Sequence, residues 1–159
     1  MRERGWGGGW RGGGEGQRRW WGGEGDDEGS RRVEESDGCV GTVDMLRDGI
    51  DFELAKTTPA RVGRKALAVN LSDLAAMGAE PAWFMLNLTL PKADARWLES
   101  FCRGMFQLAK EHNVQLVGGD TSRGPLAIAI EAHGFVPADK ALRRSGAKAV
   151  HVRITSPPM

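Results

Sequence analysis

The sequence predicts an α/β or α+β domain that occupies the middle of the chain. From residue 39 onward, short apolar runs and longer runs of helical spacing follow in the order strand, helix, strand, helix, strand, strand. Before residue 39, Met1 and Val33 are the only aliphatic residues in a stretch of glycine, arginine, glutamate and tryptophan, which cannot bury a core. We therefore expect a disordered low-complexity segment at 1–38, a folded domain at 39–150 and an irregular tail at 151–159.

Composition excludes several classes of protein. With 22 Lys and Arg against 21 Asp and Glu, the formal charge of +1 favours no strongly charged partner. Cys39 and Cys102 are too few for a disulfide framework or a zinc site. Without an apolar run of about 18 residues or a secretory h-region, we expect a cytoplasmic protein with no membrane contact.

The 1–38 segment interleaves glycine and arginine with tryptophan, which is typical of segments that stack on single-stranded nucleic acid. Acidic residues are interspersed among them, so an unstructured extension or a mis-assigned start or reading frame is favoured. Nucleic acid is therefore not an expected partner.

The first half of the domain combines a strand and a helix that both carry unexpected polar residues. The run 39–46 suits a short strand, yet it contains Asp44. Thr58 and Pro59 begin a helix whose apolar spacing continues until Gly78. This helix is apolar around much of its circumference, so we expect it to be buried on more than one side. Its polar cluster is Asn70, Ser72 and Asp73, and a buried carboxylate is costly unless it is paired or binds a metal.

The second half continues the alternation. Residues 82–90 alternate as a strand that ends at Pro91, and Asp94 caps a helix that ends near Asn113. A strand at 114–117 then leads into the segment VGGDTSRG (117–124), and 125–136 is the last strand.

Three aspartates stand where local structure prefers apolar residues: Asp44, Asp73 and Asp120. Magnesium takes oxygen ligands and keeps several waters, so a few carboxylates from separate elements can hold it beside a phosphate. Gly118 and Gly119 would let a phosphate approach backbone amides, and Arg123 and Arg144 would neutralise its charge. Spacing alone also allows these aspartates to be caps and turn formers, since neither a Walker loop nor a Rossmann fingerprint is present.

Four segments resemble a known family. Residues 65–83 (KALAVNLSDLAAMGAEPAW), 116–124, 134–137 (GFVP) and 144–148 (RSGAK) closely resemble bacterial thiamine-monophosphate kinase, a family of the aminoimidazole ribonucleotide synthetase superfamily. The resemblance implies an α+β sandwich, with a mixed β-sheet packed against helices in the superfamily's N-terminal domain. It further implies ATP-dependent phosphorylation of thiamine monophosphate to thiamine diphosphate, with magnesium ions and no covalent phospho-enzyme. The family's N-terminal domains pair as homodimers across shared β-structure, which here would use strands 82–90 and 125–136.

The resemblance also implies roles for individual residues. By motif position, the metal ligands would be Asp44, Asp73 and Asp120, with Thr42 and with Asp27 of the Gly25-Asp26-Asp27 turn as further candidates. ATP would contact Gly119, Asp120 and Arg144. Asp51 stands where the family commonly has a histidine near the thiamine site.

Two departures limit the resemblance. Val43 replaces the threonine that usually precedes the aspartate equivalent to Asp44. Family members also carry a C-terminal domain that supplies further metal and thiamine contacts, and its motifs are absent after Lys148. The hypothesis is a truncated or frame-shifted kinase, and the alternative is a non-catalytic magnesium- and nucleotide-binding or dimerisation remnant.

Overall fold

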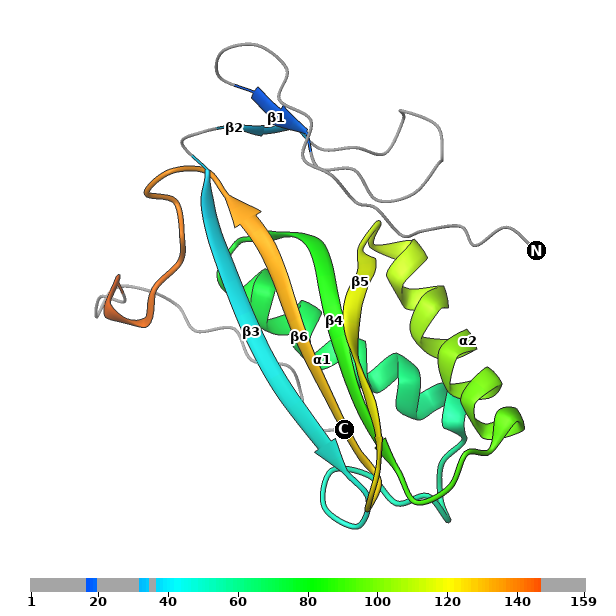
Figure 1. The fold of residues 1–159 in the computed structure, drawn as a ribbon. Helices are drawn as coiled ribbons and strands as arrows, with labels where there is room; N and C mark the ends of the chain where they lie inside the picture. The colour runs from blue at the N-terminus through cyan, green and yellow to red at the C-terminus, as the bar shows by residue number, and fades with distance from the viewer. Residues whose placement is uncertain (1–16, 20–31, 35–36, 147–159) are drawn as a thin grey trace, which may run out of the picture.

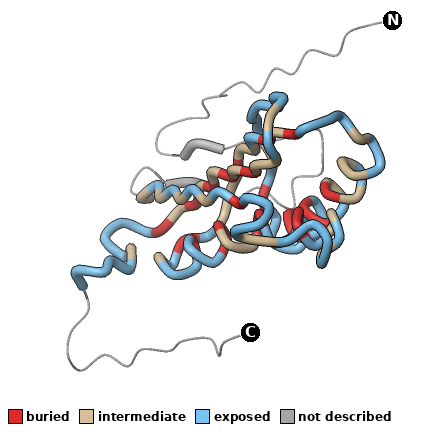
Figure 2. Tube along the Cα trace, turned by 90° about the horizontal axis from the view of Figure 1, so that it is seen from below, coloured by how far each residue is buried: buried red, intermediate tan, exposed pale blue. Residues whose placement is uncertain are grey.

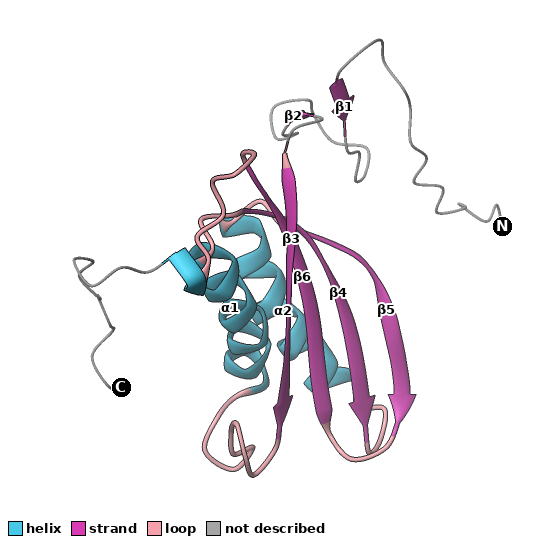
Figure 3. Ribbon diagram, turned by 90° about the vertical axis from the view of Figure 1, so that its left-hand side faces the viewer, coloured by secondary structure: helices cyan, strands magenta, loops and turns pink. Residues whose placement is uncertain are grey.

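The structure, a computed structural model, describes residues 17–19, 32–34 and 37–146. A four-stranded sheet has the strand order β3-β6-β4-β5, in which β4 and β5 are parallel and the other neighbours antiparallel (Figure 1). Helices α1 and α2 lie on one face of this sheet (Figure 3). The predicted mixed sheet packed against helices is therefore confirmed. Its elements are β3 (Gly38–Arg47), α1 (Pro59–Ala76), β4 (Glu80–Leu90), α2 (Ala95–Glu111), β5 (Gln115–Arg123), β6 (Ala127–Val136) and a 3₁₀ turn (Arg144–Gly146).

A separate pair of short strands lies within the low-complexity segment. β1 (Gln17–Arg19) pairs antiparallel with β2 (Arg32–Glu34). The predicted disorder of 1–38 stays a prediction, since only these two short strands and residues 37–38 of the segment are described. Asp27, the tryptophans of this segment and residues 147–159 lie outside the described residues.

Both helices begin and end at the signals in the sequence. The Thr58 hydroxyl accepts a hydrogen bond from the Arg61 amide at 3.3 Å, and Asp94 Oδ1 accepts from the Arg96 and Trp97 amides at 3.1 Å. Gly78 ends α1 with a φ of 73°, and the Ala79 amide bonds back to the Leu74 carbonyl at 2.9 Å. This backbone geometry is the Schellman motif, which favours glycine at that position.

The two helices approach each other through glycine. A Cβ at Gly104 would overlap the backbone of Ala60, and one at Gly63 would overlap the Phe101 carbonyl. Arg64 and Glu111 join the outer side of the helix pair, with nitrogen to oxygen distances of 3.1 and 2.9 Å. Helix α1 therefore packs against both α2 and the sheet, as its wide apolar surface predicts.

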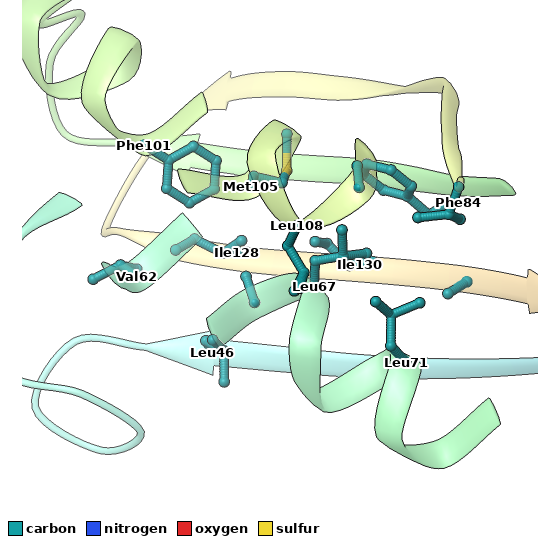
Figure 4. Close-up of a cluster of buried hydrophobic side chains, with 14 of the residues drawn as sticks. Leu46, Val62, Leu67, Leu71, Phe84, Phe101, Met105, Leu108, Ile128 and Ile130 are labelled. Carbon is teal, nitrogen blue, oxygen red and sulfur yellow. The ribbon is translucent and has the colours of Figure 1, made fainter. Parts of the chain in front are cut away.

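The core lies between the sheet and the helices. Figure 2 shows buried positions alternating with less buried ones along the strands, because successive side chains point to opposite faces. Figure 4 shows the largest of these side chains meeting where α1 and α2 cover β6 and β4. They include Phe84, Phe101, Met105, Leu67, Ile128, Ile130 and Val62, and Leu74 is likewise fully buried.

Neither of the described helices covers the other face of the sheet. On β3, the side chains of Val43 and Met45 are 67% and 56% exposed. On β4 and β6, the Trp83 ring stacks on the His133 ring at 5.3 Å between centroids, and His133 Nε2 lies 3.0 Å from Glu131 Oε1. We call this surface the open face.

Strand β5 is longer than predicted. The sequence suggests that the strand ends at Val117, but β5 pairs with β4 as far as Leu90 opposite Arg123. The register shifts between Phe84 and Met85, so that Val117 has no partner in the ladder. Such a bulge bends the strand locally. The two glycines and Asp120 are thus part of an edge strand instead of a loop.

Candidate functional site

Two of the three predicted metal ligands come together where α1 crosses β3. The Thr42 hydroxyl donates a hydrogen bond to Asp73 Oδ2 at 3.0 Å, across 31 residues of sequence. Thr42 and Asp44 are two positions apart on β3, so both side chains lie on the face covered by α1. We call Thr42, Asp44 and Asp73 the Asp44–Asp73 site.

The electrostatics of this site favour a cation. Burial raises the pKa of Asp44, and the nearby charges of Asp73 and Asp51 raise it further. The ionised carboxylate is therefore less stable here than in water, and a bound cation would reverse that. Two carboxylates and a hydroxyl suit magnesium, which retains waters in its coordination shell.

Asp51 has contacts of its own in the loop between β3 and α1. Its Oδ2 accepts a hydrogen bond from the Arg47 amide at 2.8 Å, and its backbone carbonyl accepts one from Lys65 Nζ at 2.6 Å. The Asp51 carboxylate thus connects the start of the loop that follows β3 to the last residue of that strand, Arg47. Its predicted contact with a substrate stays a prediction.

Asp120, the third predicted ligand, lies elsewhere. It pairs with Asn87 on β4, and two residues further on Thr89 Oγ1 and Ser122 Oγ lie 3.3 Å apart. This contact places Asn87, Thr89, Asp120 and Ser122 on the open face. Strand β5 is also three strand positions from β3, about 14 Å at the usual spacing. One copy of the chain therefore does not bring Asp120 to the Asp44–Asp73 site.

The two glycines before Asp120 differ from each other. Gly119 has a φ of 144°, and a Cβ there would overlap the backbone of Leu86. Gly118 has nothing within 4 Å of an added Cβ. The fold itself accounts for Gly119, whereas the open space expected beside a bound phosphate is found at Gly118.

A surface cavity of about 600 Å³ lies where β3 begins and β6 ends, and Thr42, Asp44 and Asp73 are not among its lining residues. Val40, on the same face of β3 as Thr42, lines it together with Arg143 and Ser145. The Leu142 amide donates to the Met77 carbonyl at 3.0 Å, which holds this segment against the end of α1. Arg144, predicted to bind ATP, lies next to the lining residues in the 3₁₀ turn.

Two features of this region come from the structure alone. Arg143 is exposed to solvent and also lines the cavity. Its adjacency to Arg144 in the sequence does not tell which of the two arginines lines it. Asn70 was placed with the polar cluster, yet its complete burial is visible only in the packed structure.

Among residues 17–19, 32–34 and 37–146, no group of three or more His, Cys, Asp or Glu side chains is arranged to hold a metal ion. Within the same residues, neither helix is long and apolar enough to cross a membrane. The Asp44–Asp73 site would thus need waters, phosphate oxygens or further protein ligands to complete a metal shell.

Comparison with known proteins identifies the family. Residues 25–136 match the N-terminal domain of AIR synthase related protein. The chain belongs to this family. The matched range begins before β3 and includes Asp27, Thr42, Asp44, Asp73 and Asp120.

Similar proteins are thiamine-monophosphate kinases. That of Escherichia coli K12 is 52% identical over 126 residues, which is 79% of this chain and 38% of the relative. The crystal structure of the enzyme from Stenotrophomonas maltophilia K279a is 46% identical with a TM-score of 0.68, covering 78% of this chain and 39% of that one. AaThiL complexed with AMPPCP and TMP is 30% identical with a TM-score of 0.67, covering 73% and 37%. The chain thus spans less than half the length of these relatives.

Proposed function

We propose that this chain forms the magnesium- and nucleotide-binding part of a kinase that uses ATP to phosphorylate thiamine monophosphate to thiamine diphosphate. The observation that carries the proposal is the Thr42 to Asp73 hydrogen bond beside Asp44, in a domain similar to thiamine-monophosphate kinases. The complex of AaThiL with AMPPCP and TMP supports the choice of ligands. A cytoplasmic location stays a prediction.

Magnesium would be held by Asp44 and Asp73, with Thr42 and Asp27 as further ligands. When bound, it would neutralise phosphate oxygens and orient the transferred group. Arg143, which lines the cavity, and the adjacent Arg144 would contact phosphate there. In this proposal the chain positions and neutralises the reacting groups, and no side chain forms a covalent intermediate.

The open face supports a homodimer. Val43 and Met45 expose apolar surface beside the stacked Trp83 and His133, which is typical of a surface that binds another protein. If the dimer brings Asp120 of one copy to the edge strand β3 of the other, Asp120 can serve the Asp44–Asp73 site of the partner copy. This arrangement would reconcile the three-aspartate prediction with the distance between Asp44 and Asp120 in one chain.

A second candidate function is a non-catalytic magnesium- and nucleotide-binding or dimerisation module. It is favoured by one observation, namely that the chain spans 38% of the E. coli relative. The kinase proposal then requires that the remaining substrate contacts come from protein beyond these residues.

Two measurements on the full chain distinguish the kinase from the non-catalytic module. Magnesium with a non-hydrolysable ATP analogue should raise the melting temperature, and neither component alone should do so to the same extent. A turnover assay with ATP and thiamine monophosphate then separates the kinase from the binding module. No thermal shift with both ligands would contradict the binding proposal itself.

A further inference from the structure

Asn70 is the one buried polar residue among the described core side chains. Its side chain is 0% exposed. Nδ2 donates to the Ala66 carbonyl at 3.1 Å, while Oδ1 has no hydrogen-bond partner among the described residues. The Ala66 carbonyl sets the orientation of the amide, because only the NH₂ end can donate to it. A buried acceptor without a donor destabilises the fold.

Helix packing does not explain this residue. Asn70 lies between buried apolar positions on α1, where leucine or alanine would pack without an unsatisfied oxygen. Its single hydrogen bond is to the carbonyl four residues earlier, which already accepts the helical hydrogen bond. The buried oxygen therefore requires a donor that the described residues do not supply.

The position of Asn70 indicates where that donor would come from. Asp73 follows three residues later, on the same side of α1. Helix α1 runs antiparallel to β3, since Asp73 contacts Thr42 while Leu46 lies at the Val62 end (Figure 4). Asp44 lies between Thr42 and Leu46 on β3, and thus opposite the turn of α1 that contains Asn70.

We propose that Asn70 is a positioning residue for the cation of the Asp44–Asp73 site. Its carbonyl oxygen accepts a hydrogen bond from a water bound to that cation, and this bond helps to orient the metal shell against α1. The inference rests on the proposed function for the presence of the cation. It adds a role for a neutral, fully buried side chain that does not itself touch nucleotide or substrate.

The test compares cation binding with ligand-free stability in Asn70→Leu and Asn70→Ala. Leucine has a similar branched shape without polar atoms, and alanine adds no volume, so the pair separates loss of the oxygen from steric strain. Mn²⁺ affinity is measured from the free-ion EPR signal in the presence of a non-hydrolysable ATP analogue. We expect both variants to bind Mn²⁺ about 10- to 100-fold more weakly, the range for groups that support metal ligands. Without ligand, at least one should melt at or above the temperature of the native chain.

Leu74→Ala is the matched control, because it alters the same buried side of α1 one turn later without removing a polar group. It should melt at a lower temperature and keep native Mn²⁺ affinity. Native affinity in either Asn70 variant would overturn the inference and leave the proposed function intact. If both variants melt as low as Leu74→Ala without ligand, Asn70 serves the ligand-free fold and the inference is also wrong. No Mn²⁺ binding by the native chain would overturn both proposals.

Discussion

The Asp44–Asp73 site and the 117–124 segment contain the same kinds of residues, but the fold places them in opposite surroundings. At the first, α1 covers β3, and Thr42 and Asp73 meet at 3.0 Å. At the second, Asp120 lies on the open face of the edge strand β5. The residues of the first site thus meet within one chain, whereas Asp120 lies on the opposite face of the sheet from them.

The largest expected effect comes from moving α1 away from its neighbours. Gly104→Val should abolish cooperative folding or cost more than about 3 kcal/mol, because the added side chain overlaps the Ala60 backbone. Gly118→Ala on β5 is the matched control, since its Cβ meets nothing within 4 Å, and it should change stability by about 0.5 kcal/mol or less. Urea unfolding measures both. Equal stability of the two variants would contradict the close helix packing.

Next in size is the effect of the two aspartates on cation binding. Asp73→Asn should weaken binding of Mn²⁺ with an ATP analogue by at least about tenfold, equivalent to about 1.4 kcal/mol, because it removes a charge from the Asp44–Asp73 site. Asp120→Asn should weaken it comparably only when the chain is dimeric. Met45→Lys, on the open face, should shift sedimentation towards monomer and make binding insensitive to Asp120→Asn.

Mixing the two aspartate variants sharpens the comparison. In a mixed dimer of Asp73→Asn and Asp120→Asn chains, one of the two sites keeps both carboxylates. Mixing should therefore restore part of the native Mn²⁺ binding. At most, one of the two sites in each mixed dimer should bind as in the native chain. If mixing restores nothing while each variant still forms dimers, Asp120 does not serve the partner's site.

A smaller effect is expected from the repulsion at Asp44. The pKa of Asp44 is raised in the folded chain, so the folded chain binds the proton of this carboxyl group more tightly than the unfolded chain does. The ionised form of Asp44 therefore lowers the stability of the ligand-free fold. Asp44→Asn should therefore raise ligand-free stability at pH 7, by less than about 1 kcal/mol because solvent screens this site. The gain should decrease as the pH falls through the folded pKa and vanish below the ordinary value of 3.8. Thermal unfolding at several pH values checks this, and a gain independent of pH would contradict it.

The smallest effect is expected at the outer side of the helix pair. Arg64 lowers the pKa of Glu111 through a hydrogen bond and its charge. The Arg64–Glu111 pair contributes its full stability at pH values above 4.5, the ordinary pKa of glutamate. This contribution is lost as the pH falls through the lower pKa that Glu111 has in the folded chain. Glu111→Gln should thus lower stability slightly at neutral pH, and less so at high salt. Magnesium and nucleotide binding should not change.

Much of the fold could be predicted because its signals are local. The caps Thr58 and Asp94, the stop at Gly78 and the alternation along β4 and β6 each depend on residues within one element. The structure also brings Asp73 to β3, where Thr42 and Asp44 lie, while their shared role as metal ligands stays a prediction. There the family resemblance supplied what spacing could not, since the two residues lie on different elements.

By itself, the sequence determined the type and order of the elements and which residues are out of place in them. Only the tertiary structure decided which of those residues meet. Pairing with β4 extends β5 through Gly118 and Gly119, and the bulge at Val117 helps to set which face Asp120 occupies. The side of the sheet that α1 covers decides that Asp73 meets Thr42 and that Asn70 is buried with an unpaired oxygen. Such contacts depend on strand register and helix placement, which join residues far apart in the chain and leave no local periodic signal.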